Sequence, residues 1–277
     1  MRFITWNTAA RSRKLGAQAR FLEERVPDVV ALQEVSPSTF AVWQTTLPGI
    51  GLPFVRSSLP DKLAGTRKRH LGVLIASRFP LGECVGPVVQ CPWEEKSLSL
   101  IVESPFGPIA FHAVHVPPGS SNGWVKVETL EAISGALARH HHTPTILAGD
   151  FNTPQSELAD GTVITWAQRV NKEGRPVLRK TIRGGSGQRW DSAERDVLVG
   201  LREFGLRDVF RALHGYEVQV ASWVLNRKGM SVGRRFDHVF ASPELLARRC
   251  EYLHGARTSR LSDHAALEVD FGQEISR

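Results

Sequence analysis

Two short polar side chains, Asp150 and Asn152, follow an apolar run in the sequence Ile-Leu-Ala-Gly-Asp-Phe-Asn-Thr-Pro, residues 146–154. The apolar run predicts a buried strand, and the Gly, Asn and Pro residues predict the turn that ends it. On an extended backbone, residues two apart point to the same side. A carboxylate beside an amide can orient a nucleophile and donate to a developing oxyanion. An Asx turn gives the same pattern without chemistry, so partners elsewhere in the chain must decide between the two interpretations.

Other polar residues occur where apolar segments of the chain end. They are Asn7, Glu34, His115, Asp237 and the pair 263–264, Asp-His. In a layered sheet fold such strand ends can converge on one edge, where ligands usually bind. Alternation places His238 on the face opposite Asp237, so we expect a structural role for it. The His tract at 140–142 falls at a predicted helix C-terminus, where imidazoles suit the helix dipole, and we expect no metal site there.

Hydrophobic periodicity predicts many strands and several helices to position these residues. We expect helices at 13–26, 38–47, 124–140, 191–204 (capped by Asp191 or Ser192), 206–214 and 243–249. We expect strands at 2–7, 29–35, 54–57, 71–77, near 81–90, at 97–103, 108–116, from 146, and at 218–225, 235–241, 250–256 and 265–271. Because no repeat or long linker divides the chain, we expect one domain over residues 1–277, with a basic, mobile loop or ribbon inserted around 166–195.

Composition favours a folded protein with polyanionic partners. The 277 residues are 42% hydrophobic and 23% charged, which allows a sizeable core. The net charge of +7 favours nucleic acid or phosphorylated ligands. No apolar run approaches the roughly 20 residues that span a bilayer, and the N-terminus has no signal pattern. Three scattered cysteines suit a reducing compartment. We therefore expect a cytoplasmic monomer, with no membrane association and no obligate protein partner.

Seven short blocks occur in order along the chain: Thr-Trp-Asn at 5–7, Leu-Gln-Glu-Val at 32–35, His-Val-Pro at 115–117, Gly-Asp-Phe-Asn at 149–152, Ser-Trp at 222–223, Arg-Phe-Asp-His at 235–238 and Ser-Asp-His at 262–264. Together they resemble the endonuclease/exonuclease/phosphatase family, which includes exonuclease III-like and DNase I-like nucleases, deadenylases, sphingomyelinases and inositol phosphatases. The resemblance implies an α/β fold, a four-layered α/β/β/α sandwich of two mixed β-sheets flanked by helices. It also implies a magnesium-dependent phosphoesterase site on one edge.

The resemblance implies a role for each strand-end residue. A phosphodiester is an anion, so a nucleophile approaches it only when a hard divalent cation offsets the charge. Glu34 and Asn7 are the candidate ligands of Mg²⁺, with Mn²⁺ as an alternative, and Asp263 adds a carboxylate. His264 is the candidate general base, because imidazole titrates near neutral pH, and Asp237 orients it. Asp150 positions or deprotonates the attacking water. Asn152 and His115 donate to the phosphate in the transition state.

Two positions depart from the pattern of exonuclease III-like members. Many of these have Asp two residues after the first Asn, where this chain has Ala9, and Tyr where it has His115. These changes separate the chain from the abasic-site repair enzymes and leave a second metal ligand open. The chain also lacks the Pro-x-Trp-x-Asp-Arg block of inositol phosphatases. The absent signal peptide disfavours a sphingomyelinase.

Three functions remain open from the sequence. In a nuclease, basic segments at 62–69 and 166–195, with Arg227 and Lys228, would follow a phosphate backbone. Tryptophans at 124, 190 or 223 would stack on bases, unless they belong to the core. The candidate substrate-binding residues are Trp223, Arg234, Arg235 and Lys126. The second function is a phosphatase or phosphodiesterase on a small phosphorylated metabolite or lipid head group, which needs a closed pocket. The third is a degenerate member that only binds nucleic acid.

Overall fold

Two six-stranded sheets pack face to face in this computed structural model, which describes residues 1–60, 70–84, 86–140, 142–227 and 229–272. The first sheet has the order β19 (Leu246–Leu253), β20 (Ala266–Gly272), β1 (Arg2–Asn7), β2 (Val29–Val35), β4 (Gly72–Ser77), β3 (Phe54–Ser57). The second has the order β15 (Arg207–Asp208), β18 (Asp237–Ala241), β8 (Thr145–Asp150), β7 (Gly107–His115), β6 (Ser97–Ser104), β5 (Leu81–Glu83). The pairs β1–β2 and β7–β8 are parallel and the other neighbouring pairs in these sheets are antiparallel, so both sheets are mixed.

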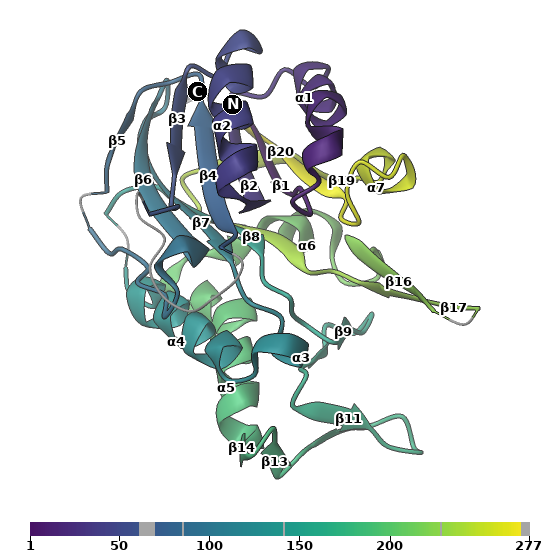
Figure 1. Cartoon of the computed structure of the whole chain (residues 1–277). Helices are drawn as coiled ribbons and strands as arrows, with labels where there is room; N and C mark the ends of the chain where they lie inside the picture. Colours follow the sequence, from purple (N-terminus) through teal and green to yellow (C-terminus); the bar gives the residue numbers. More distant parts are fainter. Residues whose placement is uncertain (61–69, 85, 141, 228, 273–277) are drawn as a thin grey trace.

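Helices cover the outer faces of both sheets (Figure 1). The helices α1 (Leu15–Glu23) and α2 (Pro37–Gly49) lie on the first sheet, and α4 (Val125–Leu137) and α5 (Gly187–Leu198) lie on the second. Short helices complete the described chain: α3 (Gly119–Asn122), α6 (Val209–His214), α7 (Gly255–Thr258) and 3₁₀ turns at 12–14, 94–96 and 200–204. None of the helices described is long and apolar enough to cross a membrane.

Strand alternation divides the core into three apolar clusters. On β1, Phe3 points between the sheets, where it meets Phe111 edge to face at 5.3 Å. The neighbouring residues Ile4 and Trp6 point the other way, into the cluster beneath α1 and α2. A third cluster joins the second sheet to α4 and α5. Three clusters separate four layers, which confirms the predicted α/β/β/α sandwich.

Three predictions for local structure differ from the observed elements. Residues 243–249 were expected to be a helix, but β19 begins at Leu246 and pairs with β20, because a half-buried strand covers the sheet edge. The helix expected from residue 191 begins at Gly187, and the Ser186 side chain caps it by accepting from the Arg189 backbone N–H. The expected strand at 218–225 is displaced to β16 (Trp223–Arg227).

The basic segment at 166–195, expected to be a loop or ribbon, consists of two hairpins and a helix. It contains the hairpins β11 (Gln168–Val170) with β12 (Pro176–Leu178) and β13 (Thr181–Ile182) with β14 (Gly185–Ser186), followed by α5. The first hairpin projects away from the sandwich, as does the hairpin of β16 with β17 (Met230–Arg234) (Figure 1). A small ribbon, β9 (Ser156–Glu157) with β10 (Val163–Ile164), lies between them. The other predicted basic segment, 62–69, lies outside the described residues.

Candidate active site

Strand register places three of the predicted site residues in one row across the second sheet. Asp150, the last residue of β8, pairs with His115 at the end of β7 and with Asp237 at the start of β18. Directly opposed residues of neighbouring strands point to the same face. The preceding residue must be glycine, because Gly149 has φ +147° and a Cβ there would lie 1.9 Å from the Val114 carbonyl oxygen. The close approach of β7 and β8 therefore sets the spacing of this row.

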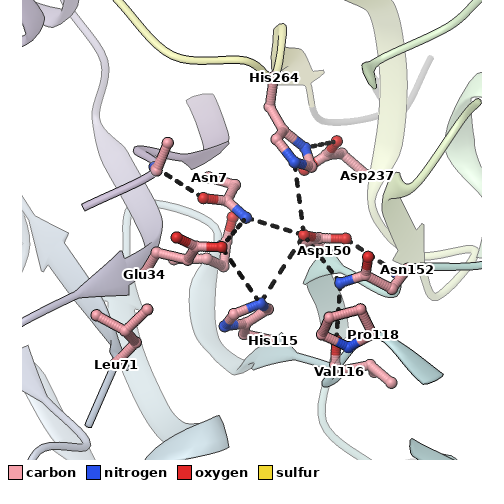
Figure 2. A network of polar contacts seen from close by, with 12 residues as sticks. Asn7, Glu34, Leu71, His115, Val116, Pro118, Asp150, Asn152, Asp237 and His264 are labelled. Carbon is pink, nitrogen blue, oxygen red and sulfur yellow. Dashed lines mark hydrogen bonds and ion pairs between the residues drawn. The ribbon is translucent and has the colours of Figure 1, made fainter. Parts of the chain in front are cut away.

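The first sheet contributes Asn7 and Glu34 to the opposite side of the same site (Figure 2). Glu34 lies at a break in the register of β2 with β4 and has φ +58°, so a bulge turns its side chain toward the site. The Asn7 amide nitrogen donates to Asp150 Oδ2 at 2.9 Å and to Glu34 Oε1 at 3.3 Å, while its oxygen accepts from the Ala9 N–H. The amide therefore bridges two carboxylates. This differs from the predicted role of Asn7 as a metal ligand, which requires the oxygen to face the site.

His264 joins the two sheets at the site. Its Nδ1 lies 2.8 Å from Asp237 Oδ2, and its Nε2 lies 3.8 Å from Asp150 Oδ2. The Ser262 hydroxyl fixes the approach of this segment, because it donates to the Asn7 carbonyl and accepts from the His264 N–H. Ser222 fixes Asp237 by accepting from the Phe236 and Asp237 N–H groups. Figure 2 shows the resulting row of His264, Asp150 and His115 facing Asn7 and Glu34.

Asn152 reaches Asp150 by a turn and not by an extended backbone, which corrects the reason given for their proximity. Asn152 has φ +51°, and its N–H donates to Asp150 Oδ1 at 2.8 Å. Its side-chain nitrogen faces the Val116 carbonyl at 2.9 Å and Asp150 Oδ2 at 3.3 Å. This is the Asx-type geometry that sequence alone could not separate from a catalytic arrangement. Here the turn serves to orient the carboxylate.

Burial and charge give the ionisable groups of the site unusual pKa values. Burial, reinforced by the nearby Asp237 charge, raises the pKa of Asp150 to about 7. Burial alone would lower the pKa of His264, but Asp237 and Asp150 outweigh it and raise that pKa to about 10. Burial and the positive charges of Lys96 and His264 hold the pKa of His115 well below its usual value. The two histidines of one site therefore carry different charges at neutral pH.

The oxygen donors of the site fit a hard divalent cation. Glu34 and Asp150 present carboxylates on either side of Asn7, and Asp150, Asp237 and His264 place ligand atoms within 4.8 Å of one another. Asp237 Oδ1 is buried and has no hydrogen-bond partner among the described residues. No arginine or lysine forms an ion pair with Glu34, Asp150 or Asp237 in the described part of the chain. Carboxylates without an arginine or lysine partner are the kind of oxygen ligands that Mg²⁺ and Mn²⁺ bind.

Asp263, the third predicted metal ligand, lines the same cleft. Its Oδ2 accepts from the Trp223 indole N–H at 3.1 Å. The Trp223 ring in turn stacks on Phe236, with ring centroids 5.4 Å apart. The carboxylate thus anchors an aromatic wall, and its other oxygen has no hydrogen-bond partner among the described residues.

A large cleft opens above these residues. Its volume is about 1280 Å³, and its lining includes Glu34, Asp150 and His264 on the floor. The walls carry aromatic rings and cations from β16, from residues 179–183 and from loops: Trp93, Lys96, Trp166, Arg179, Arg183, Trp223 and Phe236. The candidate catalytic groups are therefore accessible to a large ligand.

Two of the four predicted substrate-binding residues lie elsewhere. Arg235 is buried and forms ion pairs with Glu157 and Asp208, so its prediction as a substrate contact is wrong. Lys126 is also buried, with its ammonium 2.8 Å from Glu194 and 2.9 Å from the Asn152 carbonyl, which contradicts a direct contact with substrate. The sequence alone does not show whether a charged residue forms a buried ion pair.

The other two residues remain available at the cleft. Trp223 lines it, and the half-buried Arg234 guanidinium lies 5.8 Å from the centre of the Trp166 ring. Of the other tryptophans considered, Trp190 is buried beneath the cleft, and Trp124 packs against it at 5.4 Å. Both therefore belong mainly to the core.

Sequence reasoning missed Lys96, Trp93 and Trp166. Trp166 donates from its indole N–H to the Asn152 carbonyl at 3.0 Å, and Lys96 reaches His115. Little in the sequence marked these residues as part of the site. Trp93 and Lys96 occur in a connector between strands, and Trp166 begins a segment that was interpreted only from its positive charge. His238 is buried between Asp208 and the Thr153 carbonyl, as expected for a structural residue.

Comparison with known proteins places the chain in a family. The model of the Endonuclease/Exonuclease/phosphatase family matches residues 4–264, so the chain belongs to this family and is a phosphoric ester hydrolase. A comparison with curated protein sequences found no match.

Solved structures of the same fold cover nearly the whole chain. An AP endonuclease from Archaeoglobus fulgidus has a TM-score of 0.68 at 21% identity, with 98% of this chain and 99% of that chain covered. The 3′ phosphatase NExo from Neisseria, bound to a product DNA hairpin, has a TM-score of 0.62 at 20% identity, with 98% and 99% covered. TDP2 from D. rerio, in complex with a single-strand DNA product, has a TM-score of 0.65 at 15% identity, with 99% of both chains covered. At these identities the likeness concerns the fold.

Proposed function

We propose that the protein is a divalent-metal-dependent nuclease that hydrolyses phosphodiester bonds of DNA or RNA. The observation that carries this proposal is the cleft above Glu34, Asp150 and His264. Its volume of about 1280 Å³ exceeds the roughly 300–1,000 Å³ of most small-molecule sites. A small phosphorylated metabolite or lipid head group would leave much of this space unfilled. Two of the solved structures named above hold DNA products, which supports the same choice of substrate.

The walls of the cleft suit a nucleic acid strand. Arg179 and Arg183 supply charge for phosphates, and Arg234 lies over the Trp166 ring at the rim. Trp223 and Trp166 supply flat apolar surfaces on which bases can stack. Since base stacking and phosphate pairing are tolerant of sequence, we expect binding without strong sequence preference and with a marked salt dependence.

Glu34 and Asp150 would hold the metal, with Asp263 at the margin of the site. Mg²⁺, or Mn²⁺ in its place, would offset the charge of the phosphodiester and of the leaving oxygen. Asn7 keeps the two carboxylates at a fixed separation through its amide nitrogen. Ala9 offers no further oxygen from its side chain, so these residues favour a single metal.

Asp150 accepts the proton of the attacking water in this proposal. In the site without metal its pKa is about 7, and a bound cation would favour the ionised form that accepts a proton. The sequence argument gave the base role to His264. The Asp237 carboxylate instead raises the pKa of His264 to about 10, so the ring is an imidazolium that stabilises negative charge on the phosphate.

Asn152 and His115 have distinct tasks. Both amide hydrogens of Asn152 face acceptors, the Val116 carbonyl and Asp150, so we propose that it positions Asp150 and does not bind the phosphate. His115 Nε2 faces the space between Glu34 Oε1, at 3.8 Å, and Asp150 Oδ2, at 4.0 Å. A phosphate oxygen entering this space would accept a hydrogen bond from His115.

A cleavage panel tests the proposal. Supercoiled plasmid, single-stranded DNA, RNA and several phosphomonoesters are incubated with the protein in Mg²⁺, in Mn²⁺ and in a chelator. We expect metal-dependent cleavage of at least one nucleic acid, and its loss in His264→Ala and Asp150→Asn. Release of phosphate from a small ester with no cut in any nucleic acid would instead establish the phosphatase alternative. Binding to nucleic acid without hydrolysis in either metal would establish the degenerate, binding-only member.

A further inference from the structure

A buried lysine contacts His115 from the side away from the carboxylates. Lys96 ends the 3₁₀ turn at 94–96 and is only 5% exposed. Its ammonium donates to the Leu71 carbonyl at 2.8 Å and lies 3.1 Å from His115 Nδ1. Lys96 and His115 both line the cleft of the proposed nuclease site. The lysine thus belongs to the wall of the site, and His115 lies between it and the carboxylates.

This contact determines which nitrogen of His115 carries the proton. A lysine ammonium has three N–H donors and no acceptor. A hydrogen bond to it therefore requires a lone pair on His115 Nδ1, and an imidazolium would instead oppose N–H to N–H. The ring proton must lie on Nε2, which faces Glu34 at 3.8 Å and Asp150 at 4.0 Å. Nε2 is consequently a donor aimed at the place where the reacting phosphate would lie.

The opposite arrangement holds for the other histidine of the site. His264 presents Nδ1 to the Asp237 carboxylate at 2.8 Å, which requires an N–H on that nitrogen. Nδ1 of His115 thus accepts from the Lys96 ammonium, whereas Nδ1 of His264 donates to the Asp237 carboxylate. The two rings face Asp150 from two sides (Figure 2).

We propose that Lys96 is a positioning residue that fixes the tautomer of His115, so that His115 acts as a neutral hydrogen-bond donor to the phosphate and transfers no proton. The tautomer follows from the Lys96 contact alone, whereas its use on a phosphate rests on the proposed nuclease function. The side chain that faces Nδ1, here Lys96, thus determines whether Nε2 of His115 is a donor or an acceptor.

Nitrogen NMR of the histidine side chains tests the tautomer without substrate or metal. The full chain is labelled with ¹⁵N-histidine, and the His115 signals are assigned by their loss in His115→Gln. We expect an unprotonated Nδ1 and a protonated Nε2 in the wild type and in Lys96→Arg. In Lys96→Glu, whose carboxylate accepts a hydrogen bond, we expect Nδ1 to become protonated. A protonated Nδ1 in the wild type, or the same His115 signals in wild type and Lys96→Glu, would overturn the proposal.

Kinetics then test the consequence for hydrolysis. In Lys96→Met, which has a side chain of similar length, we expect kcat to fall about 10- to 100-fold, with KM within about threefold of wild type. Lys96→Arg should keep kcat within about fivefold, and the exposed Lys14→Met is the matched control. Thermal melting identifies any variant that fails to fold, and Lys96→Met then serves for NMR in place of Lys96→Glu.

The two measurements separate the two proposals. If the wild type hydrolyses no phosphoester, the nuclease function fails, while the NMR spectra still decide whether Lys96 sets the tautomer of His115. If the tautomer changes in Lys96→Met or Lys96→Glu and kcat does not, Lys96 has no positioning role in the reaction.

Discussion

Two buried Asp–His pairs lie on opposite faces of β18, and they have different surroundings. Asp237 points into the cleft and holds His264 at 2.8 Å. The next residue, His238, points away and lies 3.1 Å from Asp208. Both pairs bring a carboxylate to a histidine Nδ1 in a buried setting. The contact between the two side chains therefore does not by itself distinguish a reactive site from a structural one.

The charges around each pair make the difference. Around Asp208, the guanidinium groups of Arg235 and Arg211 face the carboxylates of Asp208 and Glu157, so each carboxylate has an arginine partner. Around Asp237, the carboxylates of Glu34 and Asp150 have no arginine or lysine as an ion-pair partner in the described residues. The pKa values follow: that of Glu157 is lowered to about 2, and that of Asp150 is raised to about 7.

A cluster whose charges are balanced internally stabilises the fold and has no need of a ligand. A cluster with excess negative charge at the floor of a cleft costs stability until a cation or proton neutralises it. We expect the first kind of cluster to respond to mutation in stability, and the second in activity.

The largest effect should follow from replacing one aspartate of each cluster, Asp150 or Asp208, by asparagine. We expect Asp150→Asn to lower kcat by roughly 10³- to 10⁴-fold, because the proposed base and metal ligand is lost. Its free energy of unfolding at pH 8 should equal or exceed that of the wild type, since a disfavoured buried charge is removed. Steady-state cleavage and denaturant unfolding measure the two quantities.

Asp208→Asn is the matched substitution in the other cluster. It should destabilise the protein by about 3–5 kcal/mol, because Arg235 loses a buried partner. The folded fraction should keep kcat within a few fold of wild type. A loss of stability in Asp150→Asn as large as in Asp208→Asn would contradict the distinction between the clusters.

The adjacent arginines 234 and 235 give the next largest contrast. Arg235→Met should cost about 3–5 kcal/mol of stability, because Glu157 and Asp208 remain buried with one cation fewer. Arg234→Met should leave the free energy of unfolding within about 0.5 kcal/mol, because this side chain is half-buried and forms no ion pair in the described residues. It should weaken nucleic acid binding and reduce the salt dependence of the affinity.

Denaturant unfolding and binding titrations at several salt concentrations measure both arginine variants. Equal affinity for nucleic acid in Arg234→Met and wild type would remove Arg234 from the substrate surface. A weaker affinity of folded Arg235→Met, measured below its unfolding midpoint, would restore Arg235 to it.

The pH dependence of stability should have opposite signs in the two clusters. The pKa of Glu157 is lowered from 4.5 to about 2, so its stabilisation is present above pH 4.5 and is lost as the pH falls toward 2. The loss amounts to roughly 3 kcal/mol. The pKa of Asp150 is raised from 3.8 to about 7, so its ionisation destabilises the fold as the pH rises from 4 to 7.

Unfolding free energies of the wild type, Glu157→Gln and Asp150→Asn between pH 2 and 8 separate these contributions, because other groups cancel in the differences. We expect the gap between wild type and Glu157→Gln to narrow below pH 4.5. The gap between Asp150→Asn and wild type should widen in favour of the variant from pH 4 to 7, in metal-free buffer. If the contributions of Glu157 and Asp150 to stability changed with pH in the same direction, the two carboxylates would lie in similar environments.

Much of the fold and the site could be predicted from the sequence, because both depend on local patterns. Strand alternation placed Asp237 and His238 on opposite faces, and the end of each apolar run marked a residue that the structure brings to one edge. The family resemblance supplied the order of these blocks. The helix expected at 243–249 failed because pairing with β20 outweighed the helix propensity of the segment.

The charged residues of the site were the least predictable part. In the sequence, nothing distinguishes Arg235 and Lys126 from Arg234. Only the structure shows that Arg235 and Lys126 are buried against carboxylates, those of Glu157, Asp208 and Glu194. These partners are distant in the chain, so no spacing rule identifies them. Lys96 was missed for the same reason, since its contact with His115 depends on where the 3₁₀ turn at 94–96 lies in the fold.

The smallest effect should come from the turn that joins the two clusters. The Asn152 carbonyl accepts from Trp166 Nε1 on the side of the cleft, and the Thr153 carbonyl accepts from His238 on the other side. Trp166→Phe removes one hydrogen bond, so we expect a loss of about 1 kcal/mol in stability and less than fivefold in kcat. A fall of more than about tenfold in kcat, with stability unchanged, would mean that the indole contributes more to substrate contact than the stacking surface that phenylalanine retains. Binding of abasic and base-containing oligonucleotides then tests that contact, because stacking on Trp166 requires a base.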